Sequence, residues 1–287
     1  MEQQPQKVEK VEVLKEMPEE WRILREKVLK NFESKTDGMD IERVKDFIKG
    51  QGLPVSDFLI VEREDIPKLQ VLFMELNSSL SADMEGRYIP ELDLTFVRRD
   101  YNSEKNNGAI YTEGILVHEL THSVGCSKEY IKKAENVFVP RIGFGFTKES
   151  FGLFLEEGFA ELMRGEYVDK NLTREEKESI KMAQSKQVSD ENGYGMKDKY
   201  MFFEDGKLEH SLLSVAGVGL EILCGAIPNL RQTFAEARGD LEKLREIPKL
   251  INGIKPGLYM EIQKCEPTPS GLIKTYNLIK EAVQNSK

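Results

Sequence analysis

Hydrophobic and polar residues follow one another along this chain with two different periods. Residues 19–32 carry Trp21 and Leu24 among apolar positions three or four residues apart, which is the spacing of a helix with one buried face. Residues 92–98 alternate instead, as a strand does, and the apolar run 58–61 predicts a second strand. Helices and strands together predict an α+β fold. Further helices are predicted over residues 40–48, 66–76, 112–124, 153–164, 211–227, 230–245 and 270–285.

Charge and composition narrow the choice of partners. The 287 residues include 41 Lys and Arg against 50 Asp and Glu, for a net charge of −9. This balance argues against a general nucleic-acid binder, which needs a cationic surface, and gives no attraction to anionic lipid. The long apolar run 211–227 contains Glu221 and is too short to span a membrane. We therefore expect neither a nucleic acid nor a membrane as partner.

The cysteines and the first residues bear on the compartment. Cys126, Cys224 and Cys265 form an odd, sparse set without a C-x-x-C pair, so no disulfide framework or cysteine metal site is predicted. The N-terminus shows neither a basic segment nor an apolar segment of the kind found in signal peptides. These features together favour a reducing, cytoplasmic location. Residues 1–18, rich in Gln, Glu and Lys, predict a disordered tail.

One motif points to a metal ion. Residues 118–122 read His-Glu-Leu-Thr-His, and two of the chain's three histidines stand in it. On a helix, His118 and His122 project from one face, so both imidazoles can reach a single ion. Glu119 between them is not a ligand and has the chemistry of a general base.

A catalytic zinc usually takes a third protein ligand. The extended motif of the metzincins would need a histidine at position 128, where this chain has Lys128, so that family is excluded. Residues 154–161 offer carboxylates instead and read Phe-Leu-Glu-Glu-Gly-Phe-Ala-Glu. This segment resembles the glutamate-helix motif of the gluzincin metallopeptidases.

The resemblance covers roughly residues 92–165 and implies roles for particular residues. It identifies Glu157 as the third zinc ligand, with Glu156 as the competitor if the register slips by one residue. It identifies Glu161, four residues further along the same helix face, as an acceptor for a hydrogen bond from a ligating histidine, which would fix the tautomer of that ring. Gly158 lacks a side chain and would let the motif helix and the glutamate helix approach closely.

The same resemblance implies a fold and an activity. Residues 19–165 would form a zincin-like catalytic part with a small mixed sheet, and residues 166–287 a mainly helical part that completes the cleft. The expected protein is a zinc metallopeptidase, an endopeptidase acting on a peptide or protein substrate, with Glu119 as general base for a zinc-activated water. The chain departs from the family in the long segment 123–156 and in lacking a G-x-M-E-N motif, which argues against aminopeptidase activity. The layout is closest to that of small bacterial gluzincins.

Two points of the expected site stay open in the sequence. His210, the third histidine, stands in the region from which gluzincins supply a donor to the oxyanion, and Tyr194 and Tyr200 are rivals for that role. The strand over residues 92–98 is either a sheet edge that binds extended peptide or a plain core strand. Alternative functions are a non-catalytic binding module with the zincin fold and a metal-dependent hydrolase of a non-peptide amide.

Overall fold

The protein is a mixed α+β structure that is mostly helical, with small sheets. The computed structural model describes residues 11–14, 16–53, 55–73, 85–99, 107–123, 130–133, 136–138, 152–178, 200–202, 208–238, 240–266 and 268–286.

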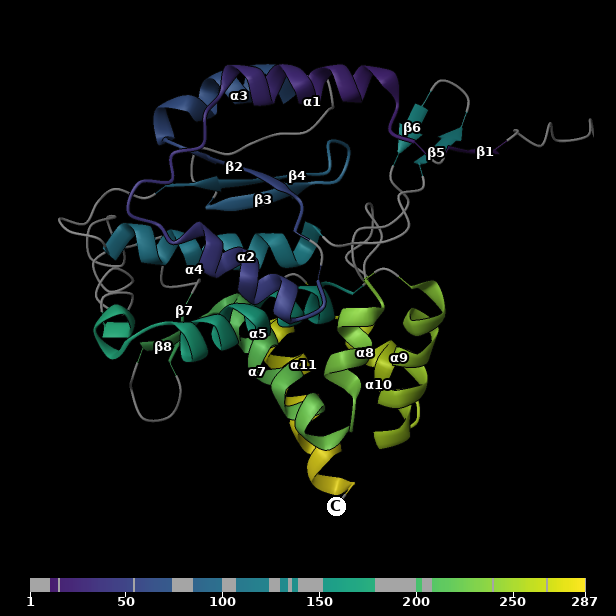
Figure 1. Ribbon diagram of the computed structural model, residues 1–287. Helices are drawn as coiled ribbons and strands as arrows, with labels where there is room; N and C mark the ends of the chain where they lie inside the picture. Colours follow the sequence, from purple (N-terminus) through teal and green to yellow (C-terminus); the bar gives the residue numbers. More distant parts are fainter. Residues whose placement is uncertain are drawn as a thin grey trace, which may run out of the picture.

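A three-stranded sheet lies between two layers of helices (Figure 1). Its order is β2-β4-β3, with β2 parallel and β3 antiparallel to the central strand β4. Helices α1 and α3 cover one face, and α2 and α4 lie beneath the other (Figure 1). The elements of this part are α1 (Glu19–Asn31), α2 (Ile41–Gly50), β2 (Asp57–Val61), a short 3-10 turn (Arg63–Asp65), α3 (Ile66–Phe73), β3 (Gly86–Ile89), β4 (Leu94–Arg98) and α4 (Asn107–Ser123).

Alternating side chains of β2 divide the interior into two hydrophobic clusters. Leu59 and Val61 belong to the cluster beneath α1 and α3, whereas Ile60 belongs to the larger cluster around α4. This alternation is the period of two that a strand imposes. Because both faces of β2 and β4 are covered, the sheet is a fixed platform for α4, the helix that carries the HExxH motif.

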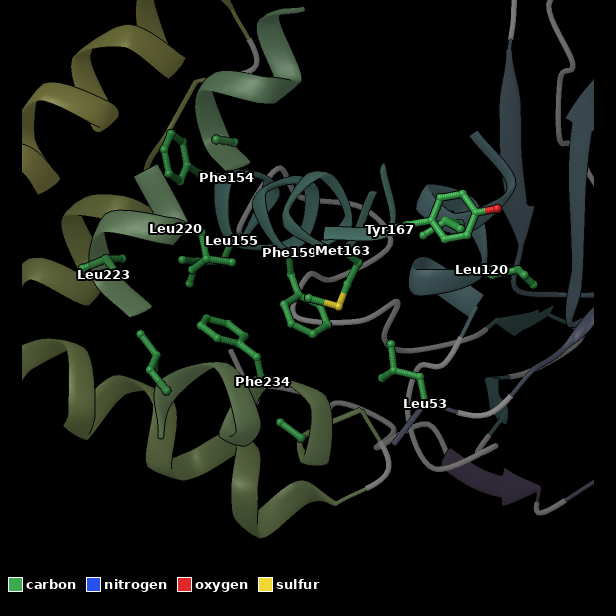
Figure 2. Close-up of a cluster of buried hydrophobic side chains, with 14 of the residues drawn as sticks. Leu53, Leu120, Phe154, Leu155, Phe159, Met163, Tyr167, Leu220, Leu223 and Phe234 are labelled. Carbon is green, nitrogen blue, oxygen red and sulfur yellow. The ribbon is translucent and has the colours of Figure 1, made fainter. Parts of the chain in front are cut away.

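The C-terminal half is built from helices that extend the larger cluster (Figure 1). Leu155, Leu220 and Phe234 meet there, and the rings of Phe159 and Phe234 stack with centroids 5.6 Å apart (Figure 2). The elements are α5 (Leu153–Asn171), β7 (Tyr200–Phe202), β8 (Leu208–Ser211), α7 (Leu212–Ala226), α8 (Leu230–Glu236), α9 (Leu241–Ile254), α10 (Leu258–Gln263) and α11 (Pro269–Asn285). The predicted boundary at residue 165 falls inside α5, which therefore belongs to both parts of the chain.

Glycines set the close contact between α5 and α7. A Cβ atom on Gly158 would lie 2.7 Å from the backbone oxygen of Ala216, and one on Gly217 would lie 2.9 Å from Cβ of Glu161. The sequence prediction that Gly158 serves the approach of the motif helix is thus corrected, because it faces α7 and not α4. The contact fixes the glutamate helix against the C-terminal half.

Several predicted elements are confirmed and others are corrected. Helices α1, α2, α7 and α11 lie where the periodicity places them, and the Asp40 side chain caps α2 by accepting a hydrogen bond from the Arg43 amide. Helix α4 starts at Asn107 and not at the predicted residue 112, and the Thr112 hydroxyl donates to the Gly108 carbonyl inside the helix.

Two further predictions of helix ends are wrong. Helix α5 does not stop at Gly165, because buried Tyr167 anchors the next turn and donates its hydroxyl to Glu113 of α4. The helix predicted over residues 230–245 is two helices, and the side chain of Asp240 caps the second by accepting from the Glu242 amide.

A separate three-stranded antiparallel sheet joins the start of the chain to the segment that follows α4. Strand β1 (Val11–Leu14) pairs with β5 (Tyr130–Lys133), which pairs with β6 (Asn136–Phe138). The prediction of a disordered tail over residues 1–18 is corrected for residues 11–14, which pair with β5, because Val11 and Val13 favour extended backbone. Residues 1–10 lie outside the described ranges.

Candidate metal centre

Three donor atoms from α4 and α5 converge on one point. Nε2 of His118 and Nε2 of His122 face each other at 3.0 Å. Oε2 of Glu157 lies 3.3 Å from the first nitrogen and 3.5 Å from the second. The i, i+4 spacing on α4 brings the two rings together, and α5 supplies the carboxylate across the helix interface.

The triangle of donors has the size that a small divalent ion needs. A tetrahedral zinc ion bound at 2.0–2.1 Å leaves its ligand atoms about 3.3 Å apart. The three sides of the triangle, from 3.0 to 3.5 Å, agree with this spacing. Nitrogen and carboxylate donors are also the types that such ions take. His118, His122 and Glu157 are therefore a group that could bind a metal ion.

The other ring nitrogens of the two histidines each face a buried carboxylate. Nδ1 of His118 lies 2.8 Å from Oε1 of Glu161, and Nδ1 of His122 lies 2.8 Å from Oε1 of Glu156. The contact at His122 is a hydrogen bond, which holds the proton at Nδ1 and leaves the lone pair of Nε2 for a metal, whereas the contact at His118 lacks hydrogen-bond geometry. The structure thus places Glu157 with the donor atoms and Glu156 behind His122, which separates the two candidates for the third ligand by position.

Electrostatics at the site favour positive charge. Burial alone would lower the pKa of His118, but the carboxylates of Glu157 and Glu161 outweigh it and raise the pKa to about 9. The pKa of His122 is also raised, against burial, by Glu157 and Glu156. The pKa of Glu157 is lowered in turn, because the two histidines outweigh the effect of its burial. This balance is what a cation-binding pocket requires.

Glu119, the residue between the histidines, lies against strand β3. Its partly buried carboxylate accepts a hydrogen bond from the backbone N–H of Tyr88, and burial raises its pKa. A Cβ atom on Gly86 would lie 2.5 Å from Cγ of Glu119 and 2.9 Å from its Oε1. The absent side chain at Gly86 therefore makes the space in which the Glu119 carboxylate lies.

Strand β3 is the sheet edge that lies against Glu119. The predicted strand over residues 92–98 corresponds to β4, which lies between β2 and β3, so the core-strand alternative holds for it. Within the described residues β3 pairs with β4 alone. The Arg98 amide donates to the Glu85 carbonyl, so the ladder alternation turns the backbone groups of Gly86 and Tyr88 away from β4.

Sequence reasoning missed two arginines behind the histidines. Nη1 of Arg238 donates to Oε1 of Glu156 at 2.6 Å, and Nη1 of Arg164 donates to Oε1 of Glu161 at 3.1 Å. The i, i+3 spacing of Glu161 and Arg164 on one helix was a usable signal for the second pair. Nothing in the sequence links Arg238 to residue 156.

The expected oxyanion donors are placed only in part. His210 lies on β8, opposite Met201 of β7, and not at the start of the apolar helix, which begins at Leu212. Tyr200 is on β7. The side chains of His210 and Tyr200 and the whole of Tyr194 lie outside what the structure describes, so the role of these residues stays a prediction.

A second feature in the described part of the chain is a cavity of about 580 Å³ between α2 and the start of α4. Buried Glu113 lines it and accepts hydrogen bonds from Arg43, Tyr167 and the Asp40 amide. The cavity contains none of the metal donors, and Arg43 in its lining bonds to both Glu113 and Glu176. We interpret this network as a brace between α2, α4 and α5.

Comparisons with known proteins assign no function, so a functional proposal has to be argued from the geometry of the site. No protein-family model, no curated protein and no solved structure matches the chain. No helix in the described ranges is long and apolar enough to cross a membrane.

Proposed function

We propose that this protein is a zinc-dependent peptidase of the gluzincin type, with a zincin-like catalytic part. The observation that carries the proposal is the triangle of His118, His122 and Glu157, whose sides agree with tetrahedral zinc coordination. Glu119, placed in the same motif and not among the donors, is the proposed general base. A non-catalytic module would have no use for a carboxylate held in this position.

The proposed role of each residue follows from the position of its side chain. His118, His122 and Glu157 would hold the ion, which lowers the pKa of water and polarises a carbonyl group when it is bound. Glu119 would take a proton from the attacking water and pass it to the leaving amine. Its raised pKa brings a carboxylate closer to the range in which it can both accept and return a proton. His210 remains the proposed oxyanion donor, with Tyr194 and Tyr200 as rivals.

The substrate is proposed to be a peptide or protein in extended conformation. The outward backbone groups of Gly86 and Tyr88 on β3 stand beside Glu119, so a peptide that added to this edge would pass the general base. The Tyr88 N–H already donates to the Glu119 carboxylate, so a bound peptide would compete with Glu119 for this hydrogen bond.

Digestion of a mixed peptide library tests the proposal. The zinc-loaded protein should cleave internal peptide bonds, a chelator should stop cleavage, and metal analysis should give one zinc per chain. Zinc binding without cleavage of peptides would favour the binding module, and cleavage of other amides alone would favour the non-peptide hydrolase. Failure to bind zinc would overturn the proposal.

A further inference from the structure

Arg238 is a fully buried arginine at the metal centre. It follows α8, is 1% exposed, and is the largest of the fully buried side chains in the described ranges. Its Nη1 donates to Oε1 of Glu156 at 2.6 Å, and its guanidinium carbon lies 5.2 Å from the centre of the Phe159 ring. Burying a guanidinium is costly and is weak support for stability, since an apolar side chain would fill the space as well.

A related arrangement occurs at both histidines, but Nδ1 of His122 is hydrogen-bonded to Glu156, whereas Nδ1 of His118 lies 2.8 Å from Oε1 of Glu161 without hydrogen-bond geometry. Arg238 contacts Glu156, which contacts Nδ1 of His122. Arg164 contacts Glu161, which contacts Nδ1 of His118. The two triads come from different places, because Arg164 belongs to α5 whereas Arg238 reaches in from the C-terminal helices.

We propose that Arg238 is a positioning residue for the metal centre, which sets the orientation of His122 through Glu156, while Arg164 does the same for His118 through Glu161. The inference rests on the proposed metal binding and goes beyond it, because it assigns the alignment of one ligand to the C-terminal half of the chain. In this arrangement the packing of α8 against α5 decides how well the site holds its ion.

The physical reason is that a buried carboxylate needs both a fixed place and a counter-charge. The bond from Arg238 Nη1 holds one oxygen of Glu156 at the Nδ1 side of His122. That oxygen then keeps the Nδ1 proton in place and leaves Nε2 free to bind metal. Without the arginine, the buried Glu156 carboxylate would lack this counter-charge and could turn away from His122. The hydrogen bond that orients the His122 ring would then be lost.

Nuclear magnetic resonance of the histidine rings tests this directly, because the chain has only three histidines. In the zinc-loaded protein the ligating rings are neutral, and long-range proton–nitrogen spectra of histidine-labelled protein in that state report the tautomer of each ring. In Arg238→Met the His122 signals should change while those of His118 keep their wild-type tautomer, and Arg164→Met should give the reverse. A general loosening of the structure would move both rings together and would overturn the assignment.

Zinc affinity gives a second measurement. Arg238→Met should weaken zinc binding by about 10- to 100-fold, the usual effect of losing a group that orients a ligand. The matched control is Arg231→Met: Arg231 also joins α8 to α5, through Glu166 at 2.6 Å, but its partner touches no histidine. Arg231→Met should bind zinc as the wild type does. Equal losses in both variants would overturn the proposal.

A double-mutant cycle covers the case in which Arg238→Met folds poorly. Glu156→Gln keeps an oxygen acceptor for His122 and removes the charge, so adding Arg238→Met to it should cost less zinc affinity than Arg238→Met costs alone. Additive losses would mean that Arg238 does not act through Glu156. If Glu157→Ala loses zinc but every Arg238 variant binds it normally, this inference alone is refuted. If the wild type binds no zinc, the proposed function is refuted.

Discussion

Glu156 and Glu157 are neighbours in the chain, yet they contact opposite sides of the same histidine. Oε1 of Glu156 lies 2.8 Å from Nδ1 of His122, and Oε2 of Glu157 lies 3.5 Å from its Nε2. Consecutive residues of a helix point about 100° apart, so one turn of α5 can reach both sides of a ring that stands against it. One carboxylate is thereby placed to bind an ion and the other to orient a ligand.

Substitution of each carboxylate separates these two roles. Glu157→Ala should remove a donor atom and weaken zinc binding by more than about 100-fold, whereas Glu156→Ala should lose about 10- to 100-fold. Titration against a zinc indicator measures both. Full zinc affinity in Glu157→Ala with strong loss in Glu156→Ala would mean that the register is wrong by one residue.

Glu119→Gln should keep the metal and lose turnover. The amide has the shape of the carboxylate but cannot accept a proton, and Glu119 is not one of the three donors. We expect one zinc per chain and a loss of at least about 100-fold in the rate of peptide cleavage, the scale of general-base catalysis. Unchanged cleavage with normal zinc content would eliminate Glu119 as the base.

Gly86→Ala should displace the Glu119 carboxylate without touching the metal donors. The added Cβ would lie 2.5 Å from Cγ of Glu119, which is closer than two non-bonded carbon atoms can approach. Because a shift of about 1 Å in a catalytic group can cost about 100-fold, we expect turnover to fall by about 10- to 100-fold at unchanged zinc affinity. Gly50→Ala is the control, since open space surrounds that position. Equal activity in the two variants would show that Glu119 works from another position.

The sequence predicts the motif helix and the glutamate helix because their chemistry is local. His118 and His122 are one turn apart, and Glu157 and Glu161 are one turn apart on the next helix, so each pair is fixed by helical geometry alone. Both faces of the expected site therefore come together in the structure as the spacing indicates.

The contacts that sequence reasoning misses are those between distant segments. Arg238 meets Glu156 through the packing of α8 on α5, and Gly86 meets Glu119 because a three-stranded sheet places its edge strand β3 against α4. Neither contact leaves a periodic signal in the chain. The short strand β3 also lacks the apolar alternation by which β4 was predicted, since Gly86 and Arg87 occupy half of it.

Two glycines of α5 should respond to alanine in opposite directions. In Gly158→Ala the new Cβ would meet the Ala216 oxygen at 2.7 Å and push α7 away, which should lower the free energy of unfolding by about 1 to 3 kcal/mol. Gly165→Ala meets nothing within 4 Å and should raise it by up to about 1 kcal/mol, because alanine favours the helix. Urea unfolding measures both. A stabilising Gly158→Ala would contradict the close packing of α5 on α7.

The pH dependence of stability should weaken when zinc is added. In the metal-free protein the pKa of His118 is raised to about 9 by Glu157 and Glu161, against the opposing effect of burial. A raised folded-state pKa contributes stability that is fully present below the unfolded value, about 6.5, and is lost as pH rises through about 9. The metal-free melting temperature should therefore fall across this window.

Zinc needs the neutral imidazole, so the proton competes with it, and the stabilisation by a fixed low concentration of zinc should grow from about pH 6.5 to about pH 8.5. Thermal unfolding with and without zinc, and with His118→Ala as control, measures both trends. A zinc-induced shift that is the same at every pH would show that no proton leaves the histidines when the metal binds.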